Sequence, residues 1–293
     1  MSLEIQISPN TPDLWLGGVY ERTYGTRREG WVLTEDTATA ITLRQPHEES
    51  DSVMILANGW TGSLNSMRTA AKEAVRAGHN AVTFEYSNTG TQTALESNAE
   101  DMASVMKALP QNWEQRVTGL SMGGMVTIMA MGHENVPKPV SATLVASAGF
   151  LPRDPSFIET VQHLYAESSE LFAHSLRRPL TAAKVGFAAT RHIVRRPWAI
   201  GAEIAELTHG SIHEDVVNLK ESHDAPDIHF AYGDRDRLIP PEVQEEGIVG
   251  MPFDNVWKYQ GGHTALVFNP GLARQLFNLD NSVIDLEPLR EAA

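Results

Sequence analysis

The chain has 293 residues, 42% of them hydrophobic and 20% charged, a balance that suits one large α/β domain or a core with a small accessory domain. The formal net charge of −14 argues against general nucleic-acid binding, because a phosphate backbone would repel such a chain at long range. The absence of cysteine excludes disulfides, thiolate metal sites and cysteine nucleophiles, and it fits the reducing cytoplasm in which we expect the protein.

The first half of the chain alternates short apolar runs with helical stretches, a pattern typical of a mostly parallel sheet with helices on both faces. Residues 1–10 lack the basic and apolar regions of a secretory signal, and no run of 18 apolar residues occurs, so we expect neither a signal nor a membrane span. The predicted elements here are strands at 30–34, 38–43, 52–57, 80–86, 115–120 and 140–146, and helices at 65–77, 95–109 and 122–131.

The rhythm changes between residues 151 and 225, where apolar residues recur at helical spacing and no strand is evident. We expect three or four helices there, broken near Pro179, Pro197 and Gly210. Strand patterns resume at 227–232 and 255–259, and a closing helix follows Pro270. The sequence therefore predicts a core in two parts, residues 1–150 and 226–293, interrupted by a helical insertion at 151–225.

A candidate nucleophile lies between a predicted strand and a predicted helix. Residues 119–123 read G-L-S-M-G and match the G-x-S-x-G pattern of a nucleophile elbow, with Ser121 at its centre. Such a sharp turn forces strained dihedrals on the serine, and only small residues on either side leave room for the backbone to fold back. The new helix also directs its free N–H groups towards the same place.

A serine hydroxyl needs a general base, and the sequence offers an acid and a histidine downstream. Asp234 and Asp236 both follow the strand predicted at 227–232, from whose end a carboxylate can reach the cleft. We favour Asp236, while the other aspartate would belong to a surface loop with Arg235 and Arg237. His263 follows the last predicted strand, and it stands out among 11 histidines because its position gives the expected order Ser, Asp, His.

Backbone donors for an oxyanion are predicted from the segment 56–62, which follows an early buried strand and contains two glycines. The N–H groups of Trp60 and Met122 are the candidate oxyanion-hole pair, and each such donor typically contributes about 2.7–4 kcal/mol to transition-state stabilisation. The alternative interpretation is an ordinary turn in which Trp60 fills the core.

Taken together, these motifs resemble those of the α/β-hydrolase superfamily over about residues 30–280. The matching pieces are Asn58-Gly59-Trp60, the turn at 84–90, the elbow at 119–123, and the segments 233–240 and 261–263. The early loop of this family usually reads His-Gly where this chain has Asn58-Gly59, but that histidine is not itself catalytic in the family. Serine at position 121 argues against the dehalogenases and epoxide hydrolases of the family, which use an aspartate nucleophile.

The resemblance implies an eight-stranded, mostly parallel sheet with a helical cap inserted after the sixth strand, where residues 151–225 fall. This insertion contains six basic residues in a stretch without acidic ones: Arg177, Arg178, Lys184, Arg191, Arg195 and Arg196. They would contact an anionic group of the substrate or of a carrier protein, or they form a solvated helix face. Its aromatic residues would line an acyl pocket or form the core of the cap.

The function predicted from these residues is hydrolysis of a carboxylic ester, or of a related small acyl substrate, through an acyl-enzyme. Ser121 would attack the carbonyl, His263 would act as base and then acid, and Asp236 would hold the imidazole, with no cofactor or metal required. One alternative is a thioesterase or acyltransferase with the same triad, and another is a non-catalytic ligand-binding protein on the same fold. The oligomeric state is left open.

Overall fold

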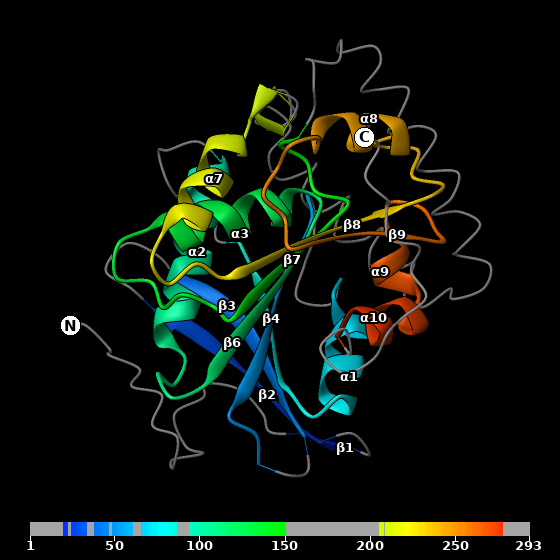
Figure 1. Cartoon of the computed structure of the whole chain (residues 1–293). Coiled ribbons are helices and arrows are strands. Elements are labelled where there is room, and N and C mark those ends of the chain that lie inside the picture. The colour runs from blue at the N-terminus through cyan, green and yellow to red at the C-terminus, as the bar shows by residue number, and fades with distance from the viewer. Residues whose placement is uncertain are drawn as a thin grey trace.

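The computed structural model describes residues 20–22, 25–33, 38–46, 49–60, 66–86, 94–150, 205–207 and 209–277. Within these ranges the chain forms one sheet, flanked on both faces by helices (Figure 1). The strands are β1 (Tyr20–Arg22), β2 (Gly25–Leu33), β3 (Ala38–Gln45), β4 (Ser52–Ala57), β5 (Asn80–Glu85), β6 (Glu114–Leu120), β7 (Ser141–Val145), β8 (Asp227–Gly233) and β9 (Asn255–Tyr259).

The strand order is β1-β2-β3-β5-β4-β6-β7-β8-β9. The first three strands pair antiparallel with their neighbours, and the strands from β5 to β9 in this order are mutually parallel. Because β4 lies between β5 and β6, its last residue Ala57 pairs with Gly119 in β6. The loop after β4 and the turn after β6 therefore emerge side by side at the carboxyl edge of the sheet, where ligands bind in folds of this kind.

The described sheet has nine strands, so the expected number of eight was wrong by one edge strand. The additional strand is β1, which forms an antiparallel hairpin with β2 through the pairs Tyr20↔Arg27 and Arg22↔Gly25. The opening hairpin was predicted in the correct place but too short. The charged residues between positions 20 and 29 interrupt the apolar alternation, and charged residues are common on strands at the edge of a sheet.

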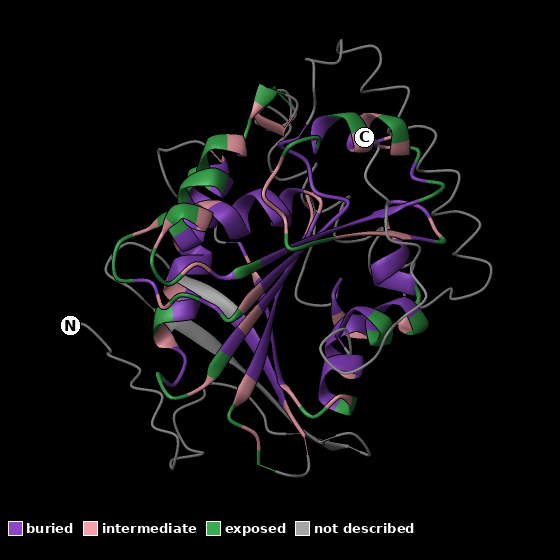
Figure 2. Cartoon of the chain, viewed as in Figure 1, coloured by how far each residue is buried: buried purple, intermediate pink, exposed green. Residues whose placement is uncertain are grey.

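The two faces of the sheet carry separate cores, as the alternation along β4 illustrates. Val53 and Ile55 belong to the larger core, whereas Met54 and Leu56 belong to the smaller one. A parallel strand covered on both faces has no polar side, so its sequence is a continuous apolar run. Figure 2 shows the buried residues concentrated along these central strands and on the sheet-facing sides of the helices.

Two layers of helices cover these cores (Figure 1). The larger core is formed with α2, α3 and α7, and the smaller one with α1, α9 and α10. The helices are α1 (Arg68–Arg76), α2 (Ala94–Ala108), α3 (Met122–Gly132), α7 (His213–Glu221), α8 (Pro241–Gly247), α9 (Ala265–Phe268) and α10 (Pro270–Phe277). The predicted helices at 65–77, 95–109 and 122–131 and the closing helix after Pro270 are thus confirmed to within a few residues.

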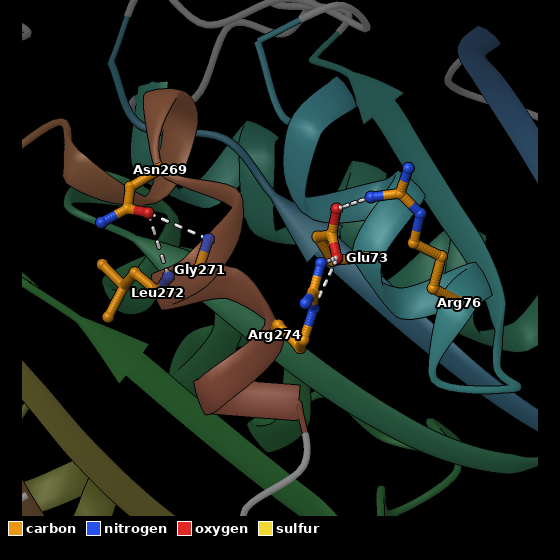
Figure 3. A network of polar contacts seen from close by, with 6 residues as sticks. All are labelled: Glu73, Arg76, Asn269, Gly271, Leu272 and Arg274. Atoms are coloured by element: carbon orange, nitrogen blue, oxygen red, sulfur yellow. Dashed lines mark hydrogen bonds and ion pairs between the residues drawn. The ribbon is translucent and has the colours of Figure 1, made fainter.

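In the helix layer of the smaller core, a buried carboxylate joins α1 to α10. Glu73 of α1 is 2% exposed, and it pairs with Arg76 on its own helix and with Arg274 of α10, whose Nη2 lies 3.0 Å from Oε2 (Figure 3). The same figure shows how α10 begins. The Asn269 side chain accepts the N–H of Gly271 at 2.9 Å and caps the helix, while Pro270 occupies the first turn, where its missing N–H costs nothing.

Most of the predicted insertion lies outside the described residues, including positions 151–204 with the six basic residues and the aromatic residues. Within the described part of that range, α7 packs on α3 and buries Val216 and Leu219 in the larger core. No helix among the described residues is long and apolar enough to cross a membrane.

Candidate active site

The turn at Ser121 has the strained backbone that the sequence predicts. Ser121 lies between β6 and α3 with φ 55° and ψ −120°, one of the few described residues other than glycine with positive φ. Residues other than glycine rarely adopt this backbone conformation, and holding it costs on the order of 1–3 kcal/mol. Its N–H donates to the Val145 carbonyl of β7 at 2.9 Å, and its carbonyl accepts the N–H of Gly124, also at 2.9 Å.

The glycines beside the serine are required by close backbone contacts. A Cβ atom at Gly123 would lie 2.5 Å from the Ala57 carbonyl oxygen and 2.6 Å from that of Asn58, and a Cβ at Gly119 would collide with the Gly123 carbonyl. Only hydrogen fits at these positions. The turn around Ser121 is therefore packed against the end of β4, and the loop after β4 contacts this turn.

That loop is the segment from which an oxyanion donor was predicted. A Cβ at Gly59 would lie 3.3 Å from Ser121 Cβ and 3.9 Å from its Oγ, so this backbone passes directly beside the hydroxyl. The next residue, Trp60, is half-buried against the larger core. Met122 is the first residue of α3, where backbone N–H groups have no acceptor within the helix. Both candidate donors thus belong to segments adjoining Ser121.

Hydrogen bonds made by Asn58 and Tyr86 hold the loop after β4 in place. The buried Asn58 side chain donates its Nδ2 hydrogen to the Phe84 carbonyl at 2.7 Å, and the Tyr86 hydroxyl donates to the Asn58 carbonyl at 2.9 Å. Burial, together with the negative charge of Asp101, raises the pKa of Tyr86 well above its usual range. The phenol therefore stays protonated and keeps its donor. Neither contact could be predicted from the sequence, since both join residues about 26–28 positions apart.

The predicted acid and histidine are in direct contact. His263 Nδ1 lies 2.9 Å from Asp236 Oδ2, and both side chains are buried, at 5% and 0% exposure. The other carboxylate oxygen of Asp236 accepts the N–H groups of Leu238 and Ile239, each at 2.9 Å. Because an ionised carboxylate only accepts hydrogen bonds, the imidazole carries its hydrogen on Nδ1, which makes Nε2 the basic nitrogen.

The two candidate acids have different partners. Asp234 does not bind the histidine; its Oδ1 accepts the N–H of Gly261 at 2.9 Å and also binds Arg235 at 3.3 Å. A further backbone bond joins Arg235 N–H to the Gly261 carbonyl at 3.0 Å. Asp234 therefore holds the loop that carries His263, whereas the histidine itself contacts Asp236.

All three predicted catalytic residues follow the carboxyl ends of parallel strands: Ser121 after β6, Asp236 after β8 and His263 after β9. The structure brings Asp236 and His263 into hydrogen-bonding contact. Ser121 is linked towards them through backbone bonds across β7, first to Val145 and then from Ala146 to Ala231 of β8. The described residues contain no cluster of three or more histidine, aspartate or glutamate side chains arranged to hold a metal ion.

Comparisons with known proteins come from structure alone. Neither a scan against models of protein families nor a search of curated proteins finds a match. Among solved structures, a serine hydrolase from the bacterium Cycloclasticus zankles has a TM-score of 0.64 at 13% identity, covering 87% of this chain and all (100%) of that one. An esterase from Exiguobacterium antarcticum has a TM-score of 0.60 at 17% identity, covering 86% and 99%.

A thioesterase domain from the curacin biosynthetic pathway is similar as well, with a TM-score of 0.61 at 15% identity and coverage of 86% and 99%. These structures share one architecture. The chain has the α/β-hydrolase fold. Its α/β-hydrolase sheet confirms the fold class predicted from the elbow and the strand pattern.

Proposed function

We propose that this protein is a serine hydrolase that cleaves a carboxylic ester, or a related acyl substrate, through an acyl-enzyme. Ser121 Oγ attacks the carbonyl carbon while His263 Nε2 takes the hydroxyl proton. The imidazolium then gives this proton to the leaving alcohol as the bond between carbon and leaving group breaks. Water attacks the acyl-enzyme in the same way, releasing the acid and restoring the serine.

The observation that carries this proposal is the buried contact between His263 Nδ1 and Asp236 Oδ2 at 2.9 Å. A carboxylate in this position holds the imidazole in the tautomer whose Nε2 carries no hydrogen and can accept a proton, and it stabilises the imidazolium that follows. The strained Ser121 turn supplies the nucleophile at the same edge of the sheet. The N–H groups of Trp60 and Met122 would bind the oxyanion, because their segments adjoin Ser121.

Thioester cleavage is the second candidate, because a thioesterase domain is among the similar structures. The same proton transfers apply, with a thiolate leaving in place of an alkoxide. The six basic residues at 177–196 would favour this class if they contact an anionic carrier. Turnover of p-nitrophenyl esters and of acyl-CoA with the same acyl chain separates the two candidates, and neutralising three of the basic residues tests whether they contribute to the preference.

Ser121→Ala is expected to lower turnover by at least about 10³-fold, because the nucleophile is lost and only binding and oxyanion donors remain. A fluorophosphonate probe should label the wild type and fail to label this variant. Ser104→Ala is a matched control, since the Ser104 hydroxyl donates to the Glu100 carbonyl within α2, and it should leave labelling unchanged. Absence of labelling and of turnover in the wild type would instead favour a ligand-binding protein on this fold.

A further inference from the structure

One side chain touches the Asp236–His263 pair from a helix that the sequence did not predict. Gln244 lies in α8, the short helix after the acid loop, which we define as residues 234–240 between β8 and α8. Its side chain is buried, at 1% exposure. Its Nε2 lies 3.1 Å from Asp236 Oδ2, the same oxygen that binds His263, and 2.6 Å from the Ile239 carbonyl. We propose that Gln244 is a positioning residue that fixes the carboxylate of Asp236 against His263, an inference that rests on the proposed function.

The orientation of the Gln244 amide follows from its partners. Asp236 Oδ2 and the Ile239 carbonyl only accept hydrogen bonds, so the group facing both of them must be the NH₂ end of the amide, which has two hydrogens to donate. The Oε1 end then points elsewhere, and among the described residues it is buried without a hydrogen-bond partner. A buried oxygen left in this way is destabilising, so the amide is held here by what its nitrogen binds.

The four hydrogen bonds divide the carboxylate of Asp236 into two halves. The loop N–H groups of Leu238 and Ile239 hold Oδ1, whereas Oδ2 is shared by Gln244 and His263. Two donors on one oxygen still let the carboxylate tilt about that anchor. Gln244 adds a donor to the other oxygen, Oδ2, from a helix, which fixes the plane of the carboxylate and therefore the direction in which the imidazole hydrogen must point.

Two of the charged groups near this pair have partners of their own. In the acid loop, Asp234 binds Arg235 and the Gly261 N–H. On α8, Glu245 pairs with Lys258 of β9 and accepts the Tyr232 hydroxyl. The other titratable groups of these elements are Glu242, Glu246 and Arg237. Gln244 is therefore a neutral donor on a helix that carries three glutamates, and a change of charge at this position acts directly on Asp236.

The chain offers a matched control for this test. Gln115 of β6 is also buried, donates Nε2 to a backbone carbonyl, that of Met106, at 2.9 Å, and leaves its Oε1 without a partner among the described residues. It lies at the end of β6 opposite Ser121. Gln115→Met thus reproduces the loss of a buried amide without touching Asp236.

Gln244→Met is expected to lower kcat by roughly tenfold and to leave KM within about twofold, because one hydrogen bond to a charged group is lost and substrate contacts are kept. Gln115→Met should leave both constants near those of the wild type. In an Asp236→Ala background, Gln244→Met should cost no further loss in the rate of Ser121 labelling. An additive loss in that background would show that Gln244 does not act through Asp236, and would overturn the proposal.

Gln244→Glu keeps the shape of the side chain and provides a second variant. It places a carboxyl group where Asp236 Oδ2 and the Ile239 carbonyl both accept, so the two acids share a proton until the pH is high enough to remove it. Once that proton is lost, the added negative charge favours the imidazolium, so the acid limb of kcat/KM should move to higher pH. The NMR titration of the His263 ring should move in the same direction. If neither Gln244 variant alters this titration relative to the wild type and Gln115→Met, the positioning role is wrong. A wild type without turnover would refute the proposed function alone, since the titration needs no substrate.

Discussion

Backbone strain at Ser121, the proposed nucleophile, is the feature with the clearest consequence for a single residue. Ser121 holds φ 55° because its N–H binds β7 and its flanking glycines are packed against backbone. The fold thus maintains a conformation that costs on the order of 1–3 kcal/mol in a residue with a Cβ. Glycine would adopt the same dihedrals without this cost.

Ser121→Gly is therefore expected to be more stable than Ser121→Ala by about 1 kcal/mol, after allowing for the greater entropy of glycine in the unfolded chain. Urea unfolding of the two Ser121 variants measures this difference. At Ser104, inside α2, the order should reverse, with glycine less stable than alanine by about 1 kcal/mol. Equal stability of the two Ser121 variants would mean that the turn is not strained.

The two neighbouring aspartates should differ sharply in their effect on catalysis. Asp236→Asn is expected to reduce kcat/KM by about 10³–10⁴-fold, because the amide no longer holds the catalytic tautomer of His263. Asp234→Asn keeps an oxygen for the Gly261 N–H and should cost less than about tenfold. Kinetics with one activated ester suffice for the comparison, and equal losses at the two positions would contradict the assignment of Asp236.

At the scale of elements, another carboxylate joins β8, β9 and α7 at the end of the sheet opposite Ser121. Asp254, just before β9, accepts the Ile228 N–H of β8 at 2.7 Å and pairs with Lys220 of α7 at 2.8 Å. Partial burial by itself would raise the pKa of Asp254, but the bonds from Lys220 and Ile228 outweigh it and lower the pKa below its ordinary value. One side chain thus connects two strands and a helix.

Because the pKa of Asp254 is lower in the folded protein, its contribution to stability is present above the unfolded value, about 4, and is lost as pH falls through the folded value. Asp254→Asn should lower the free energy of unfolding by about 1 kcal/mol at pH 7, allowing for partial exposure of the pair. The difference should shrink towards pH 3. Urea unfolding at both pH values measures it, with the exposed Asp224→Asn as control; a constant difference would exclude the ion pair as its cause.

The elements that the sequence predicted best are those with strong periodicity or clear end signals. The apolar run of β4 and the helix that begins at Asn269-Pro270 both belong to this class. The sequence analysis missed β1, α8 and α9, since a charged edge strand and helices of four to seven residues have no pattern long enough to recognise. The two prolines at 240–241, followed by Glu242, are a helix-start signal that would have located α8.

At the scale of the whole molecule, the fold depends on two cores separated by one sheet. Ile55 lies at the centre of β4, fully buried in the larger core. Ile55→Ala is expected to lower the free energy of unfolding by about 2–5 kcal/mol, through lost apolar contact and the cavity left behind. Val249→Ala, at a side chain that is 79% exposed, should change it by less than about 0.5 kcal/mol. Thermal or urea unfolding measures both, and a small effect at Ile55 would mean that the core collapses around the cavity.

The architecture could be predicted because burial of parallel strands leaves a strong apolar pattern, and the order of Ser121, Asp236 and His263 along the chain located the candidate site. What the sequence could not provide are contacts made only in three dimensions. The Tyr86 bond to the Asn58 carbonyl and the Gln244 bond to Asp236 have no local pattern. The cap at 151–225 and its basic residues stay predictions.

The tight packing of the elbow against the end of β4 limits how this protein could be redesigned. Residues 119 and 123 touch the same backbone that carries the loop beside the serine, so enlarging either one displaces two parts of the site together. A laboratory library that varies these positions should return glycine almost exclusively among active clones. Altered substrate preference must then be sought in side chains farther from the turn, and a distant homologue could be recognised by these small residues even after the rest of its sequence has diverged.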